Sequence, residues 1–315
     1  MDYKTALDSF SDQFNTHYEI VNGESLRPFK HIIIAGMGGS RLAPDMLAML
    51  HPELSIRVHS DYDLPFISSE NSKDTLIIAN SHSGDTAETI SAAEAALEKG
   101  LNLAIVAGGG QLAQMAEERK LPHVITPEAV GLPARLSFGY SFAAICRLLS
   151  LDSNLEISDS LKKWAEETGS KMTFVFDDKI PLIFAPRNFI EAAYVWKITL
   201  NETAKIPAYC NRLPEMDHNE LAGYDRDNNL CGRFSALFIK DGGDERMNKR
   251  IKITAETLRD NGIPVEVIDI PDGKPLARAI ASALAAHWTA YGLAVRRGVD
   301  PAEVPVIDQF KTAMR

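Results

Sequence analysis

Two stretches in the first half of the chain share one order: an apolar run, a turn rich in glycine and hydroxyl side chains, and a helical segment. One occupies 31–50 and the other 76–90. Short apolar runs between turns are typical of strands buried on both faces, and their alternation with helices indicates a parallel sheet. With further strands expected at 55–59, 101–107 and 123–125, the sequence predicts a doubly wound α/β domain of five β/α units.

The second half repeats this pattern after residues 151–168, which we interpret as a polar connecting helix and the domain boundary. A chain of 315 residues is long enough for two domains with separate cores. We therefore expect an N-terminal domain at 1–152 and a C-terminal domain at 153–315, a degenerate repeat of the first that lacks its turn rich in serine and threonine. The C-terminal elements are expected as strands at 182–185, 236–240 and 264–270 and as helices at 188–200, 245–261 and 276–297.

The turn at 81–86, SHSGDT, is the strongest candidate for a binding site, and we call it the phosphate turn. It joins a strand to a helix, and the first turn of a helix presents unpaired N–H groups at the positive end of the helix dipole. Ser81, Ser83 and Thr86 add three hydroxyls, whereas one is enough to cap a helix. This arrangement suits a phosphate monoester. Ligands of parallel sheets bind beyond the carboxyl ends of the strands, so we expect the glycine turn at 36–40 to face the same pocket.

Composition limits the classes of partner. A net charge of −10 argues against a surface that binds nucleic acid or an anionic membrane. No apolar run approaches the roughly 18 residues of a membrane-spanning helix. The acidic N-terminal segment is unlike a signal peptide. The three cysteines are widely spaced outside any CxxC motif, which fits a reduced, cytoplasmic setting.

The glycine turn also leaves a dinucleotide-binding alternative open. Gly36-x-Gly38 begins the familiar fingerprint, and Asp61 lies at the distance expected of the acidic residue that binds ribose. Arg41 occupies the third glycine position. In the fingerprint the helix packs so closely on the strand there that a side chain does not fit. A nicotinamide-dependent dehydrogenase is therefore the weaker alternative.

The stretch 201–229 is polar and irregular, which is typical of a functional loop inside an α/β domain. Its candidate chemical groups are Glu202, Glu215, His218 and Glu220, although single carboxylates and histidines are more often structural. The eight histidines of the chain lack the spacing of metal ligands, so no metal is expected. Arg135 lies near the start of another helix, where it could bind substrate or merely solubilise a loop.

Four segments together resemble the bifunctional phosphoglucose/phosphomannose isomerase family of the sugar isomerase (SIS) superfamily. They are GMGGS at 36–40, SHSGDTAET at 81–89, NETAKIPAY and LPEMDHNE within 201–220, and VIDQFK at 306–311. The third is the most specific, because the phosphate turn also occurs in amidotransferase sugar domains and in regulators. The resemblance covers nearly the full chain and implies two SIS-type, flavodoxin-like domains with doubly wound parallel sheets.

The resemblance implies a role for each matching position. Six positions match residues that bind the phosphorylated sugar: Gly38, Gly39, Ser40, Ser81, Ser83 and Thr86. Four positions match catalytic residues: Arg135, Glu202, His218 and Lys311. Arg135 corresponds to the arginine near the reacting carbons, and Glu202 corresponds to the base. His218 corresponds to the histidine that opens the sugar ring, with Lys311 assisting it.

The implied activity interconverts fructose 6-phosphate with glucose 6-phosphate and mannose 6-phosphate through a cis-enediol, without metal or cofactor. The resemblance also implies a homodimer in which His218 reaches the partner's site. Two positions depart from the family: Arg41 replaces a usual glycine and could narrow the pocket mouth, and Asp85 adds a negative charge beside the phosphate. An aminosugar-phosphate isomerase or deaminase and a non-catalytic sugar-phosphate-binding regulator stay as alternatives.

Overall fold

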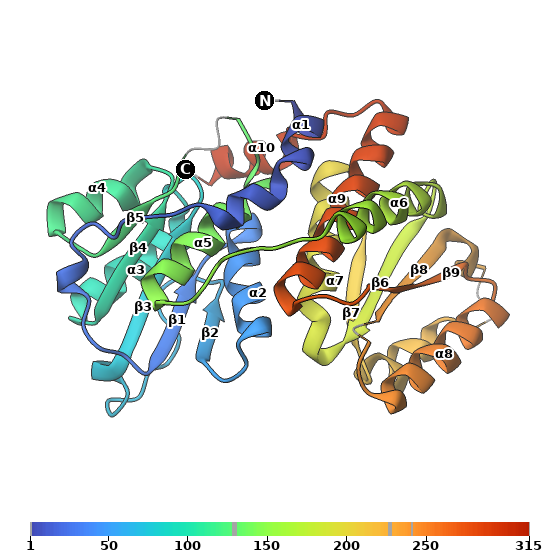
Figure 1. Ribbon diagram of the computed structural model, residues 1–315, viewed down its shortest axis with the longest axis horizontal. Coiled ribbons are helices and arrows are strands. Elements are labelled where there is room, and N and C mark those ends of the chain that lie inside the picture. The colour runs from blue at the N-terminus through green and yellow to red at the C-terminus, as the bar shows by residue number, and fades with distance from the viewer. Residues whose placement is uncertain (1, 128–130, 226–228, 241, 315) are drawn as a thin grey trace. The chain divides into compact units, whose positions relative to one another are not determined.

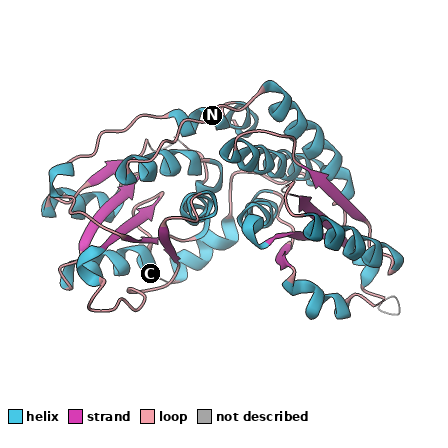
Figure 2. Cartoon of the chain, turned by 60° about the horizontal axis from the view of Figure 1, so that its bottom comes forward, coloured by secondary structure: helices cyan, strands magenta, loops and turns pink. Residues whose placement is uncertain are grey.

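The computed structural model describes residues 2–127, 131–225, 229–240 and 242–314. It divides into two compact units, Met1–Leu155 and Glu156–Arg315, which we call unit 1 and unit 2 (Figure 1). In each unit the strands form one parallel sheet, and Figure 2 shows these strands among the surrounding helices. The predicted α/β class with parallel sheets is confirmed.

The described strands of unit 1 form a five-stranded sheet with the order β2-β1-β3-β4-β5. Their bounds are β1 His31–Ala35, β2 Ser55–His59, β3 Thr75–Ser81, β4 Asn102–Ala107 and β5 His123–Ile125. All five predicted strands are confirmed. The chain runs outward from β1 to β2 and then returns to β3 on the other side of β1, so the strand order changes direction between β1 and β3. Ligands of such sheets bind at this point.

The α-helices described in unit 1 are α1 Tyr3–Asp8, α2 Leu42–Leu50, α3 Ala87–Glu98, α4 Gly110–Arg119 and α5 Phe138–Leu149. The prediction of five complete β/α units is wrong at one place. The β2–β3 connection contains only the 3-10 turn Ser72–Asp74, because Pro65 and the surrounding serines and acidic residues favour turns. At the N-terminus α1 ends at Asp8, and a 3-10 helix, Phe10–Asn15, follows it.

The core of unit 1 lies on both faces of the central strands. Every residue of β3 is buried, as expected for a parallel strand covered on both sides. On one face Ile33, Ile77 and Ile105 form a cluster with buried alanines of α3 and with residues of α4. Elsewhere Phe14 packs edge-to-face on Phe138, which anchors the N-terminal segment to α5. The sheet that carries the two predicted turns is therefore a rigid support.

The described strands of unit 2 form a four-stranded sheet with the order β7-β6-β8-β9, which repeats the order of the first four strands of unit 1. Its strands are β6 Ile180–Pro186, β7 Tyr209–Leu213, β8 Phe234–Lys240 and β9 Val265–Asp269. Its α-helices are α6 Asp159–Val175, α7 Ile190–Thr203, α8 Glu245–Asp260, α9 Pro275–Arg297 and α10 Pro305–Ala313. Of the helices in the described ranges, none combines the length and the apolar character that crossing a membrane requires.

Two predictions for unit 2 are wrong in detail. The connecting helix expected at 151–168 is α6, which begins only at Asp159, because Ser158 accepts a hydrogen bond from Leu161 N and caps it. The stretch 201–229 is not entirely irregular, since β7 lies within it. This edge strand reads YCNRL and shows no clear apolar alternation, so its pairing with β6 could not be read from its own residues.

Candidate active site

The phosphate turn begins at the carboxyl end of β3, next to the carboxyl end of β1. Ser81 is buried, and its Oγ lies 2.9 Å from Thr86 Oγ1 and accepts a hydrogen bond from Gly84 N at 3.1 Å. Ser83 is exposed, and its Oγ accepts a hydrogen bond from Asp85 N at 3.2 Å. The three hydroxyls predicted to bind phosphate thus also fix the shape of the turn, which leads into the N-terminus of α3.

The glycine turn follows β1 and contains the 3-10 helix Gly38–Arg41, which starts at a positive φ of 52° at Gly38. Two residues from the end of β3 hold Ser40 in this turn. Asn80 Nδ2 donates to the Ser40 carbonyl oxygen at 2.6 Å, and His82 N donates to Ser40 Oγ at 2.9 Å. The glycine turn and the phosphate turn are therefore in direct contact, as their positions after neighbouring strands predict.

Residues 133–137, which we call the arginine loop, press against the glycine turn. A Cβ atom added to Gly39 would lie 2.6 Å from Arg135 N and 2.7 Å from Ala134 Cβ, so only glycine fits there. Arg135 is 1% exposed. The interpretation of Arg135 as an exposed, solubilising residue is therefore wrong, because the residue is buried. Charged side chains are rarely fully buried unless they are paired. Arg135 belongs to the same cluster of loops as Ser40.

A third glycine turn, at 108–110 after β4, supports the phosphate turn from another side. Gly84 has a φ of 74°, and a Cβ atom there would lie 1.8 Å from Gly109 O. Asp85 Oδ1 accepts a hydrogen bond from Gln111 N, in the first turn of α4, at 3.0 Å. The carboxylate thus caps α4, whose dipole stabilises its negative charge. This contact gives the unusual Asp85 a structural role in a neighbouring helix.

Arg41, the other departure from the family pattern, has a partner in the first turn of α2. Arg41 Nε donates to Asp45 Oδ2 at 2.6 Å, four residues further along the chain. The side chain of Asp45 is only 5% exposed, against 34% for Arg41. A buried carboxylate needs a cationic or hydrogen-bonding partner, so Arg41 compensates the charge of Asp45 in the first turn of α2.

Glu202 lies one residue before the end of α7 and is half-buried. The following Lys205 has a φ of 58°, and its Nζ donates to the Glu202 carbonyl oxygen at 2.5 Å and to Asp300 O at 2.9 Å. A cation at a helix C-terminus satisfies the last carbonyl groups and interacts favourably with the dipole. The backbone that carries Glu202 is therefore fixed.

His218 ends the 3-10 helix Glu215–His218 and is exposed. Its neighbour Asp217 anchors this turn to α8, accepting from Arg250 Nη1 at 2.8 Å and from Thr254 Oγ1 at 2.9 Å. Lys311 is exposed on α10. The three candidate groups of unit 2 thus come from three separate elements, whereas the candidates of unit 1 form one bonded cluster.

Glu220 has a structural role, because its carboxylate accepts hydrogen bonds from two side chains of unit 2. Its Oε2 accepts from Asn211 Nδ2 at 2.5 Å and its Oε1 accepts from the Tyr224 hydroxyl at 2.6 Å. Burial and the bond to Glu220 raise the pKa of Tyr224 well above its usual value, so the phenol stays protonated as a donor. Glu220 therefore ties β7 to the segment that follows His218.

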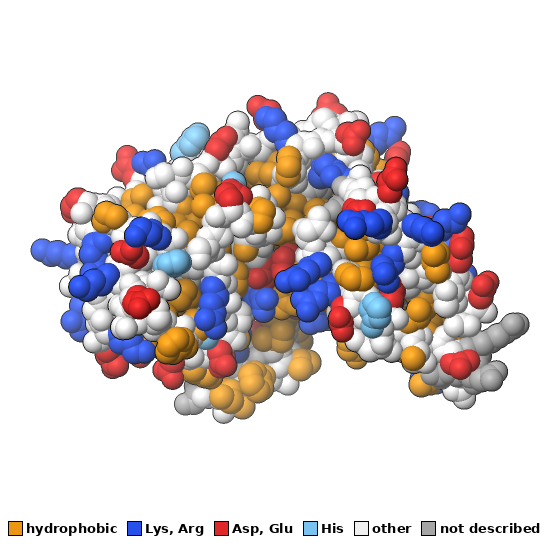
Figure 3. Space-filling model, turned by 90° about the horizontal axis from the view of Figure 1, so that it is seen from below, with side chains coloured by type: hydrophobic (Ala, Val, Ile, Leu, Met, Phe, Trp, Pro, Cys, Tyr) orange, Lys and Arg blue, Asp and Glu red, His pale blue; other side chains and the backbone are white. Residues whose placement is uncertain are grey.

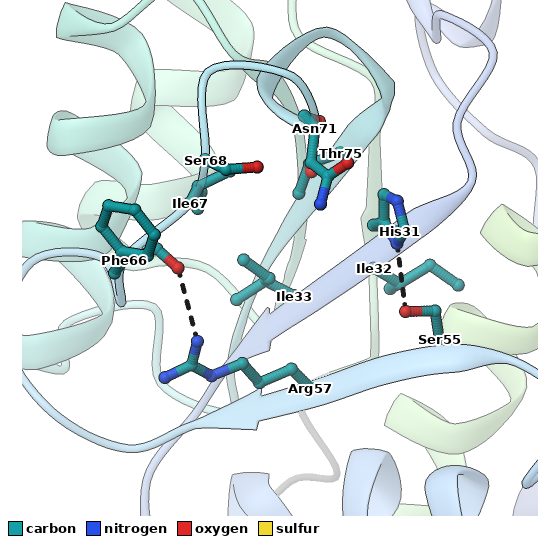
Figure 4. A pocket seen from close by; sticks show the side chains of 10 residues that line it. All are labelled: His31, Ile32, Ile33, Ser55, Arg57, Phe66, Ile67, Ser68, Asn71 and Thr75. Atoms are coloured by element: carbon teal, nitrogen blue, oxygen red, sulfur yellow. Dashed lines mark hydrogen bonds between the residues drawn. The ribbon is translucent and has the colours of Figure 1, made fainter.

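A hollow of about 260 Å³ in unit 1 lies away from these turns (Figure 4). It is lined by the first residues of three strands, His31, Ser55 and Thr75, and by Arg57, whose Nη1 donates to Phe66 O at 3.4 Å. These residues belong to the amino-terminal part of the sheet. Because ligands of doubly wound sheets bind at the carboxyl ends, we do not assign this hollow to the sugar phosphate.

Charged side chains of both signs are interspersed on the face drawn in Figure 3. Within residues 2–127, 131–225, 229–240 and 242–314, no group of three or more His, Cys, Asp and Glu side chains is arranged to hold a metal ion.

The site residues that sequence reasoning missed are Asn80, His82 and Ser137, which hold the loops of the site together through hydrogen bonds. The sequence offered little to single out these three residues, because polar residues at strand ends are common.

A family model described as the bacterial phospho-glucose isomerase C-terminal SIS domain matches residues 165–314. The chain is 15% identical to the C-terminal domain of glucosamine-fructose-6-phosphate aminotransferase from Francisella tularensis, with a TM-score of 0.71 and 96% of each chain covered. It is 29% identical over 198 residues to D-glucosamine-6-phosphate 4-epimerase from Sulfolobus acidocaldarius, covering 60% of this chain and 62% of that protein.

A longer match is the bifunctional phosphoglucose/phosphomannose isomerase of Thermoplasma volcanium. The two sequences are 31% identical over 290 residues, which cover 90% of this chain and 91% of that protein. A match over 90% of the chain extends into both units. The chain therefore belongs to the bifunctional phosphoglucose/phosphomannose isomerase family.

Proposed function

We propose that the protein is an aldose–ketose isomerase that interconverts fructose 6-phosphate with glucose 6-phosphate and mannose 6-phosphate. The observation that carries the proposal is the cluster in unit 1, where the phosphate turn, the glycine turn and the arginine loop contact one another at the point where the strand order reverses. Membership of the family, from a match over 90% of the chain, supports the substrate and the reaction class.

Phosphate binding is the first part of the mechanism. Ser83 and the Ser81–Thr86 pair offer hydroxyl donors, and the first N–H groups of α3 offer amide donors. Hydrogen bonds to a charged group contribute about 1.5–3 kcal/mol each, so a few of them hold the phosphorylated end of the sugar firmly. Binding energy from this non-reacting end can then position the reacting carbons.

Proton transfer between C2 and C1 is the second part. We assign the base to Glu202, which takes the C2 proton of the open-chain aldose while the C–H electrons form the C1=C2 bond and O1 takes up negative charge. A proton moves from O2 to O1, and return of the first proton to C1 gives the ketose. We assign Arg135 to the negative oxygen, because a fixed cation stabilises charge that develops in the transition state.

Ring opening requires a proton at O5 and removal of one from O1. We assign His218 to this step, with Lys311 assisting it, because histidine exchanges protons near neutral pH. The exposure of His218 supports a homodimer in which it serves the site of a second subunit. Both epimers can react because rotation about C2–C3 presents either face of the enediol to one base.

A coupled assay on fructose 6-phosphate tests the proposal. Glucose 6-phosphate and mannose 6-phosphate are scored with separate coupling enzymes, with and without a chelator. We expect both products at rates that chelation leaves unchanged. Formation of neither product would refute the activity, and a rate that falls with chelation and returns with added metal would refute the metal-independent mechanism.

A second candidate is an enzyme acting on aminosugar phosphates, which the similarity to the D-glucosamine-6-phosphate 4-epimerase favours. It would use the same phosphate turn but different chemistry at the reacting carbons. The discriminating measurement is turnover of glucosamine 6-phosphate compared with fructose 6-phosphate. Turnover of the aminosugar alone would replace the first proposal.

A further inference from the structure

His82 connects the loops of the candidate site in unit 1. Its N–H donates to Ser40 Oγ in the glycine turn at 2.9 Å, and its carbonyl oxygen accepts from Gly108 N, after β4, at 3.2 Å. Its imidazole Nδ1 lies 3.3 Å from Ser137 Oγ in the arginine loop. The residue between the two serines of the phosphate turn therefore contacts each of the other loops.

The partners of Ser137 indicate which atom donates in this contact. Ser137 Oγ lies 3.2 Å from Pro133 O and 3.4 Å from Ala134 O. Carbonyl oxygens only accept, and we assign the single hydroxyl proton to one of them. With this assignment Ser137 Oγ accepts a hydrogen bond from His82 Nδ1–H. The imidazole is therefore a donor through Nδ1 to the arginine loop.

Movement of Ser137 would be transmitted to Arg135. Both belong to one tight segment, in which Ser137 N donates to Ala134 O at 3.3 Å and Ser137 is 3% exposed. Arg135 N lies so near Gly39 that a Cβ atom added there would be 2.6 Å from it. The arginine loop is thus confined by the glycine turn on one side and is bonded to His82 on another.

We propose that His82 is a positioning residue for the isomerisation. Its Nδ1–H holds Ser137 and so fixes the position of Arg135 relative to the phosphate turn. This role rests on the proposed function. The pairing of Ser81 with Thr86 involves neither the imidazole nor Ser137. Loss of the imidazole donor should therefore lower kcat while leaving the KM for the phosphorylated sugar nearly unchanged.

The experiment compares His82→Leu, His82→Asn and His82→Gln, in which the amide of Asn can replace Nδ1 and the amide of Gln can replace Nε2. Ser137→Ala removes the acceptor, and His82→Leu with Ser137→Ala completes a double-mutant cycle. His51→Leu, at the end of α2 outside the site, is the matched control. The kinetic constants for fructose 6-phosphate are measured with urea unfolding of each variant.

We expect His82→Leu and Ser137→Ala each to lower kcat about 10- to 100-fold, since small displacements of positioned groups have large effects on rate. The double variant should be no slower than the slower single variant, because the two groups form one contact. His82→Asn should recover most of the rate and His82→Gln should not, and His51→Leu should match the wild type.

Additive losses in the cycle, equal rates for the Asn and Gln variants, or a change confined to KM would overturn the role of His82. So would wild-type rates in both single variants. If His82→Leu does not fold, the pair Ser137→Ala and His82→Asn still decides the question. An inactive wild-type protein would instead overturn the proposed function, so the two failures are distinguishable.

Discussion

The contact between Gly39 and the arginine loop predicts the effect of Gly39→Ala. The added methyl group would lie 2.6 Å from Arg135 N and 2.7 Å from Ala134 Cβ, and rotation of a side chain cannot relieve either approach. An ordinary contact begins at 3.4 Å, so the loop must move by about 0.8 Å. A misplacement of about 1 Å can cost 10²-fold in rate, so we expect kcat/KM to fall about 10- to 100-fold. The crowding should also lower the free energy of unfolding by about 1–3 kcal/mol.

The assay follows formation of glucose 6-phosphate from fructose 6-phosphate and measures urea unfolding on the same samples. Gly292→Ala is the matched control, because its added Cβ would lie 2.4 Å from Thr173 Oγ1 in unit 2. That variant should lose stability and keep its turnover. If Gly39→Ala shows the expected loss of stability and turns over as fast as the wild type, the position of Arg135 does not control the reaction.

Four further predictions address single groups. Glu202→Gln should lower kcat about 10²- to 10⁴-fold, the usual contribution of a general base, with inorganic phosphate still competing for the site; near-normal turnover would exclude this base. Ser83→Ala should raise the KM for fructose 6-phosphate about 10- to 100-fold, as expected for loss of about 1.5–3 kcal/mol, and an unchanged KM would remove Ser83 from the phosphate site. Asp85→Ala should lower the free energy of unfolding by about 0.5–2 kcal/mol through the lost cap on α4, which denaturant titration checks. Burial raises the pKa of Cys210 to about 11, so at pH 8 iodoacetamide should label it far more slowly in the folded than in the unfolded chain, and equal rates would contradict this.

The central strands β1, β3 and β4 of unit 1 could be predicted because each is a largely buried apolar run between clear turn residues. HIIIA and LIIA lie in the middle of the sheet, where burial on both faces requires apolar side chains throughout. The edge strand β7 could not be found in the same way. Its residues need only pair with β6 on one side, so polar and apolar residues are both tolerated and the pattern carries little information.

The candidate site, like the fold, could be predicted from the sequence only in part. The contact between the turns at 38–40 and 81–86 could be predicted, because both turns follow neighbouring strands of a parallel sheet, and their role in phosphate binding stays a prediction. The partners of these turns could not be predicted. Asn80, His82 and Ser137 hold loops that are 40 to 55 residues apart in the chain, and nothing local to each residue indicates which loop will lie against it. Long-range supports of this kind follow only from the packing of the sheet.

The two units share a strand order, and their helix N-termini explain why the phosphate turn after β3 has no counterpart after β8. In unit 1 Asp85 directs its carboxylate to α4, and so the N-terminus of α3 keeps its donors for a ligand. In unit 2 the corresponding helix after β8 is α8, and its N-cap Asp244 accepts a hydrogen bond from Arg246 N at 2.8 Å and pairs with the Arg246 side chain. That carboxylate sits where an anion would bind and repels it. With its helix N-terminus occupied, unit 2 lacks a second phosphate cradle after β8, and the proposed mechanism takes only single side chains from this unit, such as Glu202.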